Sequence, residues 1–92
     1  MIKSFKDFDT ERLFRDERVK RWRSIESVAR RKLAMIDAAD QLHDLKVPPG
    51  NRLHDLKQDR VGQYAIRIND QYRVCFLWRE GNAYDVEITD YH

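Results

Sequence analysis

Two of the three histidines in this chain stand among side chains that can exchange protons or carry positive charge. His54 is followed by an amine, Lys57, and by a further cation, Arg60. An acid, a phenol and an imidazole are consecutive at the other end of the sequence: Asp90, Tyr91 and His92. The third histidine, His43, stands beside Asp44 near the end of a predicted helix, and we interpret it as a structural or surface residue.

Such a set of side chains matches the parts needed for phosphoryl transfer in RNA without a metal ion. That reaction needs a base for the 2′-hydroxyl, positive charge for the phosphate in the transition state, and an acid for the leaving oxygen. His54, His92 and Asp90 can supply the base and the acid. The cations that can stabilise the phosphate are Lys57, Arg67 and Arg73.

Other kinds of site find little support in the residue spacing. No pair of His, Asp or Glu residues has the spacing of metal ligands on one helix or hairpin, so we expect no metal and no cofactor. The chain also has no glycine-rich phosphate loop and no nucleophilic serine motif. The lone cysteine, Cys75, lies among apolar neighbours in a predicted strand, and we interpret it as a packing residue.

Length and composition predict one small domain. The chain has 92 residues, of which 41% are hydrophobic and 37% charged, which is too hydrophobic for a disordered tail. No apolar run is long enough to span a membrane, and the first six residues lack the apolar region of a signal peptide. One cysteine excludes an internal disulfide and a cysteine-based zinc site. We therefore expect a cytoplasmic protein.

Positive charge is concentrated in residues 12–32. This segment holds nine basic residues against three acidic ones, for a local charge of +6, whereas the whole chain carries only +2. The basic residues are Arg12, Arg15, Arg18, Lys20, Arg21, Arg23, Arg30, Arg31 and Lys32. Such a block predicts contact with nucleic acid or an acidic partner; the alternative is a solvated helix face.

The hydrophobic pattern changes from helical to strand-like along the chain. Residues 2–5 alternate as a short strand, and residues 10–18 favour a short helix. A longer helix is predicted from an N-cap at Ser24, with apolar residues at three- and four-residue spacing as far as Leu42 and Leu45. Residues 48–51 end it. Period two then predicts strands at 53–56, 64–68, 72–79 and 84–88, with turns at 69–71 and 80–82.

These elements predict an α+β fold in which the helices cover one face of a three- or four-stranded antiparallel sheet. The strand residues expected under the helices are Ile66, Ile68, Val74, Phe76, Val86 and Ile88. Arg67 and Arg73 must then lie on the opposite, open face, where they are well placed to hold phosphate. The alternative is that they pair across strands with Asp85 or Glu87, for about 1 kcal/mol at most.

Four stretches of the chain carry a family resemblance. They are RKLAMIDAA at 31–39, PPGNRLH at 48–54, IRINDQYRVCF at 66–76 and VEITDYH at 86–92. With these motifs the chain resembles, over essentially its whole length, the HigB toxins of the RelE/ParE superfamily. The fold that this implies is an N-terminal strand and two helices on one face of a small antiparallel sheet. In one departure, the chain has Gln58 after Leu56-Lys57, where the family commonly has glycine.

The resemblance implies an mRNA endonuclease that depends on the ribosome. By position, His54, Asp90, Tyr91 and His92 match the family's catalytic set, with Lys57 and Arg73 as supporting cations. His54 or Asp90 would be the base and His92 the acid, and Tyr91 would stack on or orient the nucleotide. The expected products are a 2′,3′-cyclic phosphate and a 5′-hydroxyl.

The resemblance also implies partners. The basic block at 12–32, together with Arg60 and Arg67, would contact ribosomal RNA and the message in the ribosomal A site. A HigA-like antitoxin with a helix-turn-helix domain would neutralise the toxin and repress the operon, so operator DNA would be reached only through the antitoxin. Two alternatives remain: a ParE-like toxin that poisons gyrase, and a non-catalytic module that blocks the ribosome or acts as a co-repressor.

Overall fold

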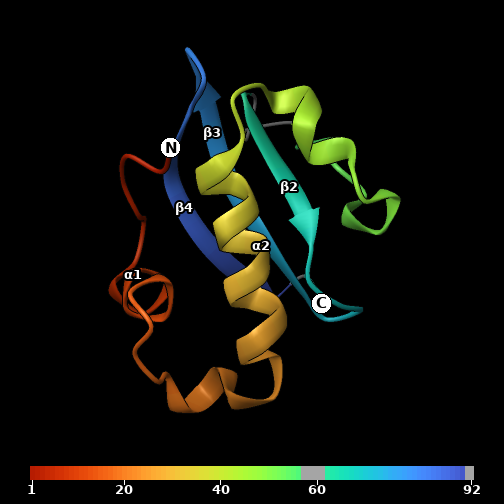
Figure 1. Ribbon diagram of the computed structural model, residues 1–92. Helices are drawn as coiled ribbons and strands as arrows, with labels where there is room; N and C mark the ends of the chain where they lie inside the picture. The colour runs from red at the N-terminus through yellow and green to blue at the C-terminus, as the bar shows by residue number, and fades with distance from the viewer. Residues whose placement is uncertain (57–61, 91–92) are drawn as a thin grey trace.

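The computed structural model describes residues 1–56 and 62–90, and its fold is α+β, as the sequence predicts (Figure 1). Within these described ranges, two α-helices, three short 3₁₀ turns and four strands follow one another. In order they are α1 (Phe8–Phe14), η1 (Lys20–Ile25), α2 (Glu26–Ala38), η2 (Leu42–Lys46), η3 (Pro49–Asn51), β1 (His54–Asp55), β2 (Gln63–Arg67), β3 (Tyr72–Arg79) and β4 (Asn82–Asp90). No helix in the described ranges is long and apolar enough to cross a membrane.

The four strands form one antiparallel sheet in the order β1-β2-β3-β4. The β2–β3 turn is held by Asn69, whose side-chain oxygen accepts hydrogen bonds from the backbone N–H groups of Gln71 and Tyr72. At the β3–β4 turn, Glu80 and Gly81 both have positive φ, the geometry of a type I′ turn. A β-carbon at Gly81 would also approach the carbonyl oxygen of Asp40 to 3.2 Å. Both predicted turns are thus confirmed.

The N-terminal segment differs from its prediction. Residues 2–5 make two isolated parallel bridges with β4, at Ile2↔Ala83 and Phe5↔Val86, instead of a continuous strand. The cause lies in β4, which bulges where Asp85 and Val86 both lie opposite Phe76 of β3. The backbone N–H of Asp85 therefore bonds the Ser4 hydroxyl at 2.9 Å and leaves the ladder.

The helices also begin and end at other residues than predicted. α1 begins at Phe8, because the Asp7 carboxylate caps it by accepting the N–H of Thr10. Ser24 is not the N-cap of α2; it lies within η1, and the cap position belongs to Ile25, which makes no side-chain cap bond.

The long helix ends earlier than its apolar spacing suggests. α2 stops at Ala38, and Ala39 has extended backbone. The side chain of Asp44 then accepts the N–H groups of Asp40 and Gln41, so η2 begins as a separate turn. Leu45 is still buried in the same core, because η2 folds back onto it.

The core lies between the helices and one face of the sheet, with α2 crossing in front of the strands (Figure 1). Leu33 and Ile36 of α2 pack in one cluster with strand residues that include Ile66 and Phe76, and these four side chains have no exposed surface. On the opposite face, a small buried apolar cluster consists, among the described residues, of Leu56, Ala65 and Cys75. Cys75 is buried and free, consistent with its interpretation as a packing residue.

Candidate functional site

A hollow of ≈ 200 Å³ lies on the open face of the sheet and is lined, among the described residues, by Arg52, His54, Arg67 and Arg73. The register explains the grouping. His54 is paired with Ala65, and Arg67 with Arg73. Because successive side chains of a strand alternate between faces, His54 shares the face of Ala65 and Arg67, opposite to Ile66. The predicted open-face placement of the two arginines fits this geometry.

The ring of His54 is fixed in one orientation. Its Nδ1 lies 2.8 Å from the carbonyl oxygen of Arg52. Because a carbonyl oxygen can only accept a hydrogen bond, Nδ1 must carry the hydrogen and donate it. In the neutral ring, Nε2 then keeps its lone pair and can accept a proton. The side chain is exposed on the edge strand, so a substrate can reach it.

Arg52 is a site residue that our sequence reasoning missed. It follows η3 with φ 48° and ψ 49°, a left-handed backbone conformation that residues other than glycine rarely adopt. Arg52 contributes to the site in two ways. Its carbonyl oxygen bonds the ring of His54, and its side chain lines the hollow. The alternation of side chains in extended segments could have indicated this role, because Arg52 stands two positions before His54 and so shares its face.

Arg67 and Arg73 give the hollow a strong positive charge. They occupy directly opposed positions on β2 and β3, where like charges repel and destabilise the pairing. Arg67 forms an ion pair with Asp70, and Arg73 Nε donates to the Thr89 hydroxyl at 3.4 Å. Asp70 is fully exposed, so its charge is strongly screened by water. A bound anion would relieve the repulsion between the two guanidinium groups.

The alternative role for these arginines was cross-strand pairing with Asp85 or Glu87. Glu87 forms an ion pair with Lys6 at 3.4 Å. Asp85 sits in the bulge of β4 with positive φ, and its backbone N–H is bonded to the N-terminal segment. Arg67 forms an ion pair with Asp70, in the turn that follows its own strand.

A buried polar contact supports the segment that carries Arg52 and His54. Lys32 of α2 is only 6% exposed, and its ammonium group donates to the side-chain oxygen of Asn51. The amide of Asn51 in turn donates to the carbonyl oxygens of Leu45 and Val47, at 3.1 and 3.4 Å. Burial lowers the pKa of Lys32, and the nearby charges of Arg31 and Arg67 lower it further. We call this contact the Lys32–Asn51 link.

Asp90 stands apart from the hollow. It ends β4 opposite Tyr72, whereas Thr89 is the residue paired with Arg73. Its carboxylate accepts a hydrogen bond from the side-chain amide of Gln71 at 2.9 Å. The structure therefore brings His54, Arg67 and Arg73 together and adds Arg52, while the register sets Asp90 one residue out of phase with them.

Four other residues predicted for the catalytic and RNA-binding site lie outside the described part of the chain. They are Lys57, Arg60, Tyr91 and His92. Within residues 1–56 and 62–90, no three His, Cys, Asp or Glu side chains gather in a way that could hold a metal ion.

Apart from the buried Lys32, the basic residues of segment 12–32 fall into two groups. Some are held by acidic neighbours: Arg12 by Asp9 and Glu17, Arg15 by Glu11, Arg21 by Asp9, and Arg30 by Glu26 and Asp16. Arg30 also donates to the carbonyl oxygens of Leu13 and Glu17, and so ties α2 to the end of α1. The other group is exposed and has no ion pair within the described ranges: Arg18, Lys20, Arg23 and Arg31.

Comparison with known proteins agrees with this fold and with the sequence motifs. A family model described as the RelE-like toxin of the type II toxin–antitoxin system HigB matches residues 3–92. Toxin HigB-1 of Vibrio cholerae is 41% identical over 85 residues, which cover 90% of each chain. Endoribonuclease HigB of Proteus vulgaris is 34% identical over 61 residues, covering 66% of this chain and 65% of that protein.

The small α+β fold and its basic sheet face thus define a toxin of the RelE type. Within that class, the chain belongs to the HigB-like family of toxins from type II toxin–antitoxin systems.

Proposed function

We propose that this toxin is a ribosome-dependent endoribonuclease that cleaves translated mRNA and thereby stops translation. The observation that carries the proposal is the hollow in which Arg52, Arg67 and Arg73 surround a histidine with an available Nε2. A cluster of three guanidinium groups suits the phosphate of RNA, and a histidine of fixed tautomer suits a general base. The name of the Proteus vulgaris relative, an endoribonuclease, supports the same activity.

In the proposed mechanism, His54 Nε2 removes the proton from the ribose 2′-hydroxyl. The 2′-oxygen attacks the adjacent phosphorus, and the bond from phosphorus to the 5′-oxygen breaks. An acid returns a proton to that leaving oxygen, a role for which His92 remains our prediction. The products are a 2′,3′-cyclic phosphate and a 5′-hydroxyl end. The arginines stabilise the charge that develops on the phosphate oxygens.

The positions of the two candidate bases favour His54. His54 lines the hollow with the arginines, whereas Asp90 is out of phase with Arg73 and bonded to Gln71. We therefore assign the base to His54. Asp90 stays in the predicted catalytic set without the role of base, and Lys57 and Tyr91 keep their proposed roles as a supporting cation and a stacking residue.

Two partners belong to the proposal. The exposed cations Arg18, Lys20, Arg23 and Arg31 are available for phosphates of ribosomal RNA, an attraction that needs no base recognition. The second partner is a HigA-like antitoxin, as expected for the toxin of a type II pair. The toxin would act in the cytoplasm, where translated messages are found.

Primer extension on a translated reporter mRNA tests the proposal. We expect cuts to appear after induction of the toxin, only on translated message, and to disappear in His54→Gln. Cuts with 5′-phosphate ends would contradict the mechanism. Growth arrest without cuts would favour the alternatives, which assays of gyrase inhibition and of ribosome binding then separate.

A further inference from the structure

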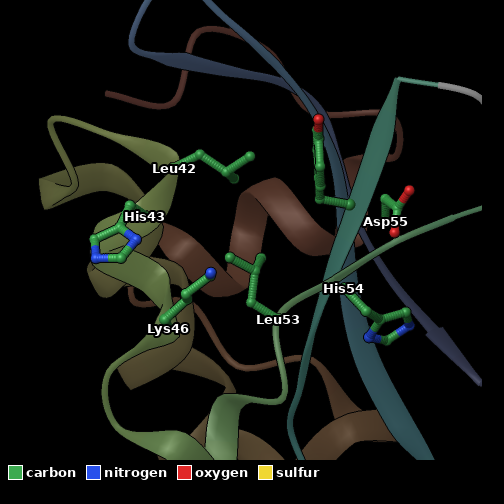
Figure 2. A pocket seen from close by; sticks show the side chains of 7 residues that line it. Leu42, His43, Lys46, Leu53, His54 and Asp55 are labelled. Atoms are coloured by element: carbon green, nitrogen blue, oxygen red, sulfur yellow. The ribbon is translucent and has the colours of Figure 1, made fainter.

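A second hollow, of ≈ 340 Å³, adjoins β1 on the side of the 3₁₀ turn η2 (Figure 2). The turn contributes Leu42, His43 and Lys46, and the strand edge contributes Leu53, His54, Asp55 and Tyr64. Asp55 is paired with Tyr64, so these two side chains share the helix face of the sheet. We call this hollow the Lys46 groove.

The Lys46 groove combines apolar surface with polar edges. Leu42, Leu53 and the ring of Tyr64 offer flat or apolar contact. His43 and Lys46 lie on one side and Asp55 on the other, with Leu53 between them (Figure 2). A nucleobase of single-stranded RNA has the matching shape and chemistry, because its faces are apolar and its edge carries both donors and acceptors.

The Lys46 groove adjoins β1 on the helix side of the sheet, and the hollow lined by Arg52, Arg67 and Arg73 (the arginine hollow) lies on the open face. His54, on this edge strand, lines both of them. An RNA phosphate held by the arginines places its ribose at His54, and the base attached to that ribose or to its neighbour then falls at the edge of β1. The strand is at the end of the sheet order, so the RNA can pass over it.

We propose that the Lys46 groove binds a nucleobase of single-stranded RNA next to the cleaved phosphate. His43 and Lys46 donate to the edge of the base, and Asp55 accepts from it. The groove thereby contributes to the choice of the nucleotides that are cut. This inference rests on the proposed function, because it needs an RNA phosphate in the arginine hollow.

Binding of an uncleavable RNA tests the inference without relying on activity. The probe is a single-stranded tetranucleotide with 2′-O-methyl groups, titrated into the toxin and followed by ¹H–¹⁵N NMR. We expect amide shifts in residues 42–46 as well as at Arg52 and His54. His43→Asn and Lys46→Met, both at exposed positions, should each weaken binding about threefold, and the double variant about tenfold. Lys3→Met, an exposed lysine at the other edge of the sheet, should bind like wild type.

Each outcome separates this inference from the proposed function. Shifts at Arg52 and His54 without shifts in 42–46 would retain the phosphate site and overturn the Lys46 groove as a base site. Shifts in 42–46 produced by an antitoxin and not by RNA would assign the groove to that partner and also overturn the inference. No shift at either place would overturn the inference, whereas the proposed function would still be decided by primer extension on translated message, because that activity depends on the ribosome. In a cleavage assay, the double variant should lose preference at one position beside the cut; an unchanged preference contradicts the inference.

Discussion

The two faces of the sheet show how the same strands build a closed core on one side and an open basic hollow on the other. Toward the helices, β2 and β3 present Ile66, Val74 and Phe76, none of which has exposed surface. On the opposite face, one position away along the same strands, they present Arg67 and Arg73. Neighbouring residues therefore contribute to different properties, and stability can be separated from activity by substitutions one residue apart.

The largest effect is expected from the base on the open face. His54→Gln should lower the cleavage rate by about 10²- to 10⁴-fold, because it removes the proton acceptor. Its unfolding free energy should change by less than about 0.5 kcal/mol, since the side chain is exposed. Initial rates on programmed ribosomes and urea unfolding measure the two effects. A rate within threefold of wild type would contradict the role of His54.

The helix face should respond in the opposite way. Phe76→Ala should lower the unfolding free energy by about 3–5 kcal/mol, because it opens a cavity against the rings of Tyr64 and Trp78. Leu77→Ala, next along the chain and only half-buried, should cost about 1 kcal/mol. Urea unfolding of both variants makes the comparison. Equal losses would contradict the assignment of the two faces.

At Arg52, a single substitution should separate the effect on stability from the effect on activity. Arg52→Gly removes the strain of the left-handed backbone but increases the conformational entropy of the unfolded chain. The two effects on the unfolding free energy are about 1 kcal/mol each and nearly cancel. Cleavage should fall about tenfold or more, because a guanidinium contact to the phosphate is lost. Arg52→Lys, which keeps the charge, should retain intermediate activity. If cleavage falls only in proportion to the unfolded fraction, the contact is refuted.

The opposed arginines predict that anions stabilise the protein. Sulfate should raise the unfolding free energy by about 1 kcal/mol at concentrations several times its dissociation constant, since it binds only the folded hollow. The unfolding free energy of Arg73→Gln should rise less in sulfate than that of wild type. Sodium chloride at the same ionic strength is the control in thermal unfolding. An equal gain with both salts would argue against a specific anion site.

The smallest effect concerns the buried lysine behind the open face. Because the pKa of Lys32 is lowered in the folded state, the unfolded chain binds more protons between that pKa and the ordinary value of 10.5. The stability of wild type relative to Lys32→Met should therefore rise with pH through this window and stay constant below it. Urea unfolding of both proteins as a function of pH measures the difference. A difference that falls with pH would contradict the shift.

Much of this architecture follows from the alternation of residues in the strands. The two-residue alternation predicts that the arginines lie on the face of the sheet opposite to Ile66 and Val74. The register of β1, which the sequence does not give, places His54 beside them. The end of α2 could not be predicted from spacing, because Leu42 and Leu45 continue the helical pattern across the break. That break depends on Asp44 bonding the backbone, a local competition that apolar periodicity does not record.

The site also has components that depend on tertiary structure. Arg52 lines the hollow with its own backbone in the left-handed conformation, and no spacing rule signals that conformation for an arginine. Lys32 appears in the sequence as one more cation of the basic segment. Its burial against Asn51, 19 residues away, depends on how η3 folds against α2.

The Lys32–Asn51 link connects α2 to the small turn that precedes the site. The N–H groups of Asn51 and Arg52 bond the carbonyl oxygens of Pro48 and Pro49 within one small turn, so local opening of that turn exposes both amides to hydrogen exchange at once. Such an opening would also break the contact with Lys32 and displace Arg52 and His54 together. Under the proposed function, the molecules competent for cleavage would be those in which this turn is closed, so a residue of α2 on the other face of the sheet would contribute to activity.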